Sequence, residues 1–239
     1  MHCTNFSKMI IRICLFAAYI LQNVCIGDYN NKDEINLINI FESSSINNNE
    51  PKKNLNITVF YESLCPDSID FFKNQFSRNW RSFYGYLNVE LVPYGKANQT
   101  KSKSGNYQFT CQHGEDECFG NRIQACAISK MYKEHRKQLF GFISCYMSHY
   151  TNQEKNGPKC ASKYNVSWMV LKRCANGKEG FNLLAKLGNR THNFKPKITY
   201  IPTIVFNNMY DEDDNYVAAS DLKSLLCIKL DNKPKKCWT

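Results

Sequence analysis

The stretch Leu55-Asn-Ile-Thr-Val-Phe-Tyr61 leads through Glu-Ser-Leu into Cys65-Pro-Asp-Ser68, and Leu87-Asn-Val-Glu-Leu-Val-Pro93 follows further along the chain. The first and last of these segments are rich in β-branched and aromatic residues, which is typical of buried strands. Between them, apolar residues from Ile69 to Trp80 recur at three- and four-residue spacing and predict an amphipathic helix. A strand, a helix and a second strand in this order predict a right-handed crossover between two parallel strands.

Cys65 falls at the N-terminus of this predicted helix. The unpaired backbone amides and the dipole of a helix favour an anion at this position, and so favour a thiolate over a thiol. The carboxylates of Glu62 and Asp67 oppose that preference if their charges lie close. Because the thiolate is the nucleophile in thiol chemistry, we predict that Cys65 is a reactive, catalytic cysteine.

The chain has three predicted parts. Residues 1–27 combine Lys8, an apolar stretch and a small-residue end, which is typical of a secretory signal peptide, although a buried N-terminal helix is the alternative. Residues 28–54 are rich in Asn, Ser and acidic residues without periodicity, and predict a flexible leader or propeptide. Residues 55–239 then form one domain. No later segment is apolar enough to span a bilayer, so we expect a secretory-pathway protein that is extracellular or lysosomal.

Four sequons for N-glycosylation agree with export from the cell. We expect the one inside the predicted first strand to be modified less readily than the other three. The four asparagines are Asn56, Asn98, Asn165 and Asn189.

Cysteine parity points to one special thiol. Of the twelve cysteines, Cys3, Cys14 and Cys25 lie in the leader, which leaves 12 − 3 = 9 in the mature chain. In an oxidising compartment an odd cysteine is a reactive thiol or an intermolecular bridge, whereas nine reduced cysteines would fit a cytosolic protein. Parity alone does not say which cysteine is free. With Cys65 set aside, the disulfide candidates are Cys111, Cys118, Cys126, Cys145, Cys160, Cys174, Cys227 and Cys237.

The rest of the domain mixes helical and strand patterns. Residues 98–190 hold six of these cysteines and several helical periodicities, and predict a disulfide-stapled helical insertion. Residues 198–206 predict a strand, in which Pro202 requires either a strand edge or a cis bond at the start. Beyond it we expect a turn at 211–215, a short strand at 216–218 and a last helix capped by Asp221.

Two stretches carry a resemblance to a known family. Tyr61-Glu-Ser-Leu-Cys-Pro-Asp67 resembles the approach to the paired active-site cysteines of the gamma-interferon-inducible lysosomal thiol reductase (GILT) family. Cys111-Gln-His-Gly114, Glu117-Cys118, Asn121 and Cys126 match the family signature at every fixed position. The resemblance covers nearly the whole predicted domain.

The resemblance implies an α/β, thioredoxin-like fold with inserted helices. It also implies reduction of protein disulfides in lysosomes, although secreted members exist, so disulfide-containing proteins are the expected substrates. Ile201-Pro202 resembles the cis-proline that packs beside the active-site cysteine in thioredoxin-like proteins. Thr203 stands where a tryptophan is common in the family.

Ser68 occupies the place of the family's second active-site cysteine. In a dithiol enzyme the first thiolate attacks a substrate disulfide and the second thiol resolves the mixed disulfide. A serine cannot resolve it, although its hydroxyl can donate a hydrogen bond to the Cys65 thiolate. We therefore predict a GILT-like thiol–disulfide oxidoreductase with monothiol or impaired chemistry, no cofactor and a need for an external small thiol. Its predicted catalytic residues are Cys65, Ser68 and Pro202.

Three other functions are alternatives to this one. A non-catalytic secreted protein that binds a secreted or cell-surface partner would explain the loss of the resolving thiol. A zinc site formed by Cys111, His113, Cys118 and Cys126 is disfavoured by their spacing and by an oxidising compartment. We instead expect His113, Gln112 and Asn121 to cap and hydrogen-bond a loop. The net charge of +10 comes from scattered lysines without a nucleic-acid-binding module, so no nucleic-acid partner is expected.

Overall fold

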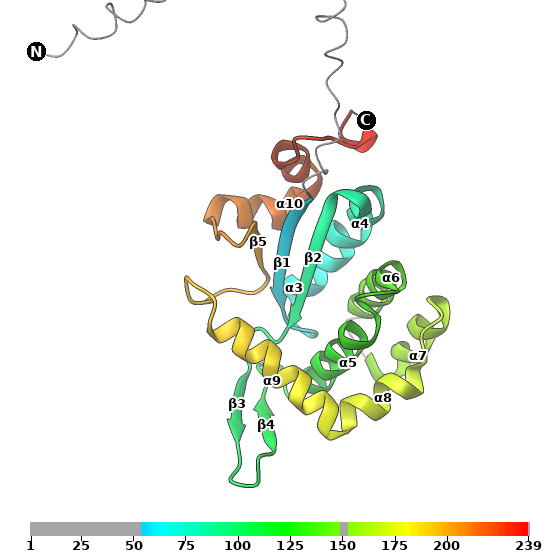
Figure 1. Ribbon diagram of the computed structural model, residues 1–239, viewed down its shortest axis with the longest axis vertical. Coiled ribbons are helices and arrows are strands. Elements are labelled where there is room, and N and C mark those ends of the chain that lie inside the picture. The colour runs from blue at the N-terminus through cyan, green and yellow to red at the C-terminus, as the bar shows by residue number, and fades with distance from the viewer. Residues whose placement is uncertain (1–53, 149–152, 239) are drawn as a thin grey trace, which may run out of the picture. The chain divides into compact units, whose positions relative to one another are not determined.

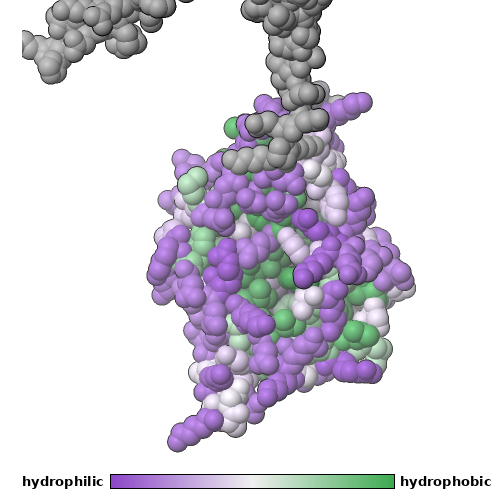
Figure 2. Space-filling view, viewed as in Figure 1, coloured by the Kyte–Doolittle hydropathy of each residue, from purple (hydrophilic) through white to green (hydrophobic). Residues whose placement is uncertain are grey.

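The computed structural model describes residues 54–148 and 153–238. The predicted signal peptide and all but the last residue of the predicted leader lie outside these residues, so both stay predictions. Within the described residues, no helix combines the length and the apolar character needed to cross a membrane. Hydrophilic side chains cover most of the face drawn in Figure 2, with apolar ones between them.

A three-stranded sheet lies at the centre of the fold (Figure 1). Its middle strand β1 (Leu55–Tyr61) pairs in parallel with β2 (Leu87–Pro93), with Leu55 opposite Leu87. On its other side β1 pairs antiparallel with β5 (Thr203–Phe206). The predicted first two strands and their parallel pairing are confirmed. Most β1 side chains are buried, as expected of a strand whose sheet is covered on both faces.

One continuous helical run connects β1 to β2. It comprises α3 (Pro66–Asp70), the π-helical turn η1 (Phe71–Phe76), α4 (Ser77–Phe83) and the short 3₁₀ turn η2 (Tyr84–Tyr86). Proline fits at the start of the run because the first amides of a helix have no partner within it. The predicted apolar stripe is buried, which confirms the amphipathic helix; its members are Ile69, Phe72, Phe76 and Trp80.

The insertion between β2 and β5 is mostly helical, as predicted. It also contains a hairpin, formed by β3 (Asn98–Lys101) and β4 (Tyr107–Thr110), that the sequence did not predict. Each strand has four residues, none of them buried, so the hydrophobic signal was too short to detect. The helices are α5 (Glu115–Met131), α6 (Arg136–Met147), α7 (Gln153–Lys163), α8 (Trp168–Asn176) and α9 (Lys178–His192).

Four disulfides join all eight candidate cysteines. Two of the bridges tie helices of the insertion together, one closes the loop before α5, and one holds the C-terminal segment to the last helix. The pairs are Cys126–Cys174, Cys145–Cys160, Cys111–Cys118 and Cys227–Cys237.

The C-terminal part corrects two predictions. Residues 211–218 are neither a turn nor a strand, because they form the cap and first turns of α10 (Glu212–Lys229), which the 3₁₀ turn η3 (Lys235–Trp238) follows. The Asp211 carboxylate accepts a hydrogen bond from the Asp214 amide at 2.8 Å and so starts this helix early. Asp221 interrupts α10 with non-helical backbone angles and accepts from the Ser224 amide at 3.1 Å, so its predicted capping role is confirmed.

The four sequon asparagines are all exposed. Asn56 is in β1, where its side-chain oxygen accepts a hydrogen bond from Asn88 at 3.1 Å. Asn189 accepts one from Gln99 at 2.9 Å. Exposure permits glycosylation, which stays a prediction at each of these sites.

Candidate active site

Cys65 lies at the junction between β1 and the helical run that follows. It is the N-cap residue of α3, and its carbonyl accepts a hydrogen bond from the Ile69 amide at 3.0 Å. Among the described residues it is the one free cysteine, and 8% of it is exposed. The structure therefore places the odd cysteine at the N-terminus of this helix, as the sequence predicts.

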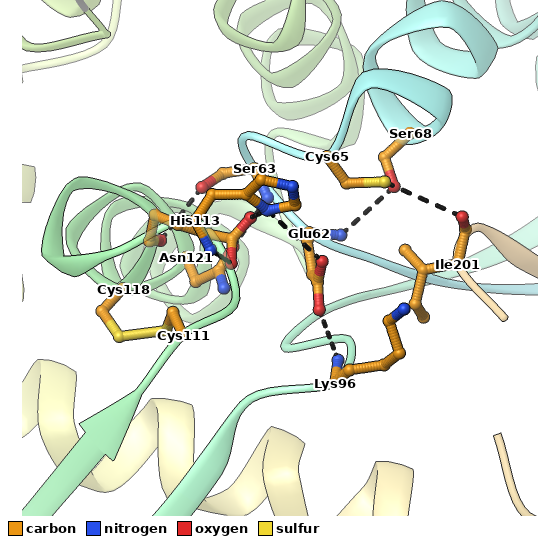
Figure 3. A network of polar contacts seen from close by, with 11 residues as sticks. Glu62, Ser63, Cys65, Ser68, Lys96, Cys111, His113, Cys118, Asn121 and Ile201 are labelled. Carbon is orange, nitrogen blue, oxygen red and sulfur yellow. Dashed lines mark hydrogen bonds and ion pairs between the residues drawn. A yellow bond between two sulfur atoms is a disulfide. The ribbon is translucent and has the colours of Figure 1, made fainter. Parts of the chain in front are cut away.

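The loop before β5 faces this thiol. The Ile201–Pro202 bond is cis, and the Ile201 carbonyl lies 3.8 Å from the Cys65 sulfur (Figure 3). Thr203 turns its hydroxyl back onto the same loop and donates to the Tyr200 carbonyl at 2.5 Å. Thr203 is thus a buried residue that hydrogen-bonds to the loop preceding it.

Ser68 lies one helical turn after Cys65 and is fully buried. Its oxygen accepts a hydrogen bond from the Glu62 amide at 3.3 Å. A hydroxyl that accepts in this way still has its own hydrogen to donate. Ser68 is thus on the helical face of Cys65 with a donor available for a thiolate.

Tyr200 and Asp67 form the rim of the site. The Tyr200 hydroxyl donates to the Asp67 carboxylate at 3.0 Å and so joins the cis-proline loop to the first turn of α3. Burial, the hydrogen bond to Asp67 and the negative charges of Asp67 and Cys65 raise the pKa of Tyr200. Tyr200 is half exposed, so this rim is accessible from solvent.

Beneath the loop between β1 and Cys65 lies a fully buried carboxyl group, that of Glu62. One of its oxygens accepts from the Lys96 amide at 2.5 Å, and the other lies 3.8 Å from His113 Nδ1. Burial has the largest effect and raises the pKa of Glu62, and the nearby charge of Glu117 raises it further. The hydrogen bond from the Lys96 amide and the charges of His113 and Lys96 lower the pKa, but the net shift is upward. Gly95 packs so closely on Glu62 that an added Cβ would lie 2.0 Å from its Cγ.

The residues of the family signature hold the same loop in place. Asn121 accepts from the Ser63 amide at 2.9 Å, and the Ser63 hydroxyl donates to the Glu117 carbonyl at 3.0 Å. The Glu117 carboxylate, also buried, accepts from the His113 amide at 3.2 Å and lies 2.6 Å from His113 Nδ1. The prediction that His113 and Asn121 hydrogen-bond a loop is confirmed, whereas Gln112 is exposed.

A zinc site on the signature cysteines is ruled out, because Cys111, Cys118 and Cys126 are in disulfides. Within the described residues, one cluster has potential ligand atoms close enough together to hold a cation. Its members are Glu62, His113 and Glu117, whose ligand atoms all lie within 4.8 Å of one another. The 2.6 Å contact between His113 and Glu117 is that of a hydrogen bond. Sequence reasoning overlooked Glu62 and Ser63 as partners of the signature, since 54 or more residues separate Ser63 from its contacts.

Glu62 gives the fold a testable dependence on pH. Because its pKa is raised above the ordinary value of 4.5, the folded state holds this proton more tightly than the unfolded chain does. The resulting stabilisation is complete below that value and is lost as the pH rises through the folded-state pKa. We expect Glu62→Gln, which keeps an acceptor for the Lys96 amide, to lose less stability than the wild type between acidic and neutral pH.

Urea unfolding at a series of pH values measures this difference. The charged groups that face Glu62, which are His113, Glu117 and Lys96, are unchanged in the variant. Two parallel profiles would contradict a raised pKa of Glu62 in the folded state.

The fold and this site together define a class of protein. The structure is similar to BdbD from Bacillus subtilis, with a TM-score of 0.51 and 16% identity over 74% of this chain and 88% of that one. It is also similar to DsbA from Chlamydia trachomatis, with a TM-score of 0.51 and 18% identity over 72% and 86%. The chain has a thioredoxin-like fold, and a free cysteine lies at the N-terminus of its first helix beside a cis-proline.

The family is narrower than this class. The family model described as gamma interferon inducible lysosomal thiol reductase matches residues 56–164. GILT-like protein 1 of Drosophila melanogaster is 38% identical over 186 residues, which are 72% of this chain and 73% of that protein. The GILT-like protein of Anopheles gambiae is 32% identical over 76% of this chain and 79% of that protein. The chain belongs to the GILT family and is a relative of thiol–disulfide oxidoreductases.

Proposed function

We propose that this protein performs monothiol exchange on protein disulfides through Cys65, in the secretory pathway or after export to lysosomes or the extracellular space. The observation that carries the proposal is the position of the thiol. It is the one free cysteine of the described residues, and it lies at a helix N-terminus against the carbonyl before a cis-proline. A helix N-terminus stabilises the attacking thiolate.

The exchange has three steps. The Cys65 thiolate attacks a substrate disulfide, which forms a mixed disulfide and releases one substrate thiol. An external thiolate attacks the Cys65 sulfur of the mixed disulfide and releases the second substrate thiol. A second external thiol then attacks the new mixed disulfide and frees Cys65. Two external thiols are oxidised to one disulfide for each substrate disulfide reduced, so electrons and protons balance.

Ser68 sets the limits of this chemistry. Its hydroxyl can stabilise the Cys65 thiolate by a hydrogen bond, but it cannot form the disulfide that would release the substrate. The external thiol therefore takes over the resolving role, and no bound cofactor is required. The Tyr200 and Asp67 rim, which bridges the cis-proline loop and α3, is where a substrate chain would first contact the site.

The test is a turnover assay on a denatured, disulfide-containing protein at acidic and at neutral pH. We expect reduction only when excess small thiol is present, and none above background with Cys65→Ala. The proposal would be refuted if reduction were the same with and without Cys65, or if no reduction occurred under any condition.

The second candidate is a non-catalytic secreted binding protein on the same scaffold. It is favoured by the absence of a resolving thiol and by the small exposed fraction of Cys65, 8%. A partner captured equally well by the wild type and by Cys65→Ala would support it. A complex that needs Cys65 and is released by reductant would support the exchange chemistry instead.

A further inference from the structure

A groove lies beside the loop that faces the active-site thiol. One wall is formed by residues 95–98, in the connection between β2 and β3, and the other by residues in 191–199, which follow α9. The groove has a volume of about 520 Å³. This is within the range of roughly 300–1,000 Å³ that is typical of sites for small molecules.

All the ionisable side chains that line this groove are basic. Three lysines and a histidine line it, and none of its lining residues is acidic; the four are Lys96, His192, Lys195 and Lys197. Lys195 and Lys197 are exposed, and neither forms an ion pair within 54–148 and 153–238. The His192 ring is held edge-on against Tyr94, with ring centroids 5.3 Å apart. A ligand with carboxylate groups would therefore meet unpaired positive charges.

One wall of the groove leads along the chain to the site of chemistry. Thr199 lines the groove and lies two residues before Ile201, whose carbonyl contacts the Cys65 sulfur. Two residues of chain span at most about 7 Å, so the wall of the groove ends close to the thiol. On the other wall, the Lys96 amide binds Glu62, and Figure 3 shows Lys96 and Ile201 on the same side of Glu62.

The overall positive charge of the chain does not explain this cluster. Two other grooves of the described surface, of about 200 and 250 Å³, have fewer basic residues in their lining: Lys130 and His135 in one, and Lys178 in the other. Lys130 is already paired with Glu179 at 2.9 Å. Of these three grooves, the one beside the cis-proline loop thus has the most basic residues in its lining.

We propose that this groove binds the carboxylates of a small anionic thiol, the external reductant that resolves the mixed disulfide on Cys65. The inference rests on the proposed function and names the class of its co-substrate: a peptide-sized thiol with more than one carboxylate. With glutathione as the probe, its thiolate attacks the Cys65 sulfur, releases the substrate thiol and stays on Cys65 as a mixed disulfide. A second glutathione displaces it as glutathione disulfide and frees the Cys65 thiolate.

One reaction step isolates the role of charge. The Cys65 thiolate attacks glutathione disulfide, forms a mixed disulfide and releases one glutathione, and intact-mass spectrometry follows the adduct. The rate of adduct formation on Cys65 is also measured with neutral hydroxyethyl disulfide and with cationic cystamine. We expect Lys195→Ser/Lys197→Ser to lower the ratio of the glutathione rate to the neutral rate roughly fivefold, since two exposed charge pairs are removed. The rate with hydroxyethyl disulfide should not change.

Lys178→Ser is the matched control. Lys178 begins α9 and His192 ends it, so Lys178 lies about 20 Å from the groove at a rise of about 1.5 Å per residue. The control should keep the wild-type ratio. Thr100→Ala removes the Asn98 sequon at the edge of the groove, and the fivefold difference should persist in that background.

The outcomes separate the two proposals. An unchanged ratio in the double lysine variant, or an equal fall in Lys178→Ser, would overturn the groove while leaving the exchange chemistry in place. No adduct on Cys65 with any of the three disulfides would overturn the proposed function and this inference with it.

Discussion

Ser68→Cys should release a fully reduced protein substrate in the absence of any external thiol, whereas the wild type should remain joined to it. Residues three apart on a helix have Cα atoms about 5 Å apart, which is within the range of roughly 4.4–6.8 Å that a disulfide bridges. Ser68 is buried on the same helical turn as Cys65, so the new thiol would already be placed for intramolecular attack. We expect this intramolecular release to be faster, by an order of magnitude or more, than release from the wild type by a small thiol in solution. The reason is that the resolving thiol no longer has to be captured from solution.

Single-turnover mixing with a disulfide substrate, quenched with acid and separated without reductant, measures this release. Ser68→Ala is the control, since it removes the hydroxyl without adding a thiol and should leave the substrate trapped. If Ser68→Cys trapped the substrate as the wild type does, the geometry inferred for positions 65 and 68 would be wrong.

Removal of the Cys126–Cys174 disulfide should have the largest effect on stability. This bridge joins α5 to α8 across 48 residues of sequence. In the loop-entropy model a bridge of this span stabilises the fold by about 4 kcal/mol, because it restricts the unfolded chain. The Cys126→Ala/Cys174→Ala variant should lose about that much free energy of unfolding, and the loss should disturb the active site, since α5 carries Glu117 and Asn121.

The Cys227–Cys237 bridge provides the comparison. It spans only 10 residues, for which the same model gives about 2.7 kcal/mol. Guanidinium unfolding of both double-alanine variants measures the two losses. An equal loss in the two variants would show that restriction of the unfolded chain does not govern the contribution of these bridges.

The parts of the fold with local signals could be predicted from the sequence. β1 and β2 are long, apolar strands, and the helical stripe from Ile69 to Trp80 repeats often enough to define its face. The position of Cys65 at the start of the helix follows from these elements alone. The exposed β3–β4 hairpin and the early start of α10 at Asp211 depend on short polar segments, in which periodicity carries little information.

The surroundings of the thiol could be predicted only in part. The cis bond before Pro202 and the role of Asn121 were expected from the resemblance and from the residue types. The hydrogen bond from the Ser63 hydroxyl to the Glu117 carbonyl depends on contacts between segments distant in sequence, and so does the burial of the Glu62 carboxyl. Side-chain contacts of that kind are fixed by tertiary packing and leave no local pattern to recognise.

Cys65 is proposed to be a nucleophile without a resolving partner. The most direct measurement is mass spectrometry of peptides after the protein has reacted with a disulfide substrate and all free thiols have been alkylated without reduction. We expect a substrate adduct on Cys65 that accumulates and disappears when a small thiol is added, while the other eight cysteines of residues 55–239 stay in their four disulfides. An alkylated Cys65 with no adduct, or an adduct on any other cysteine, would contradict it.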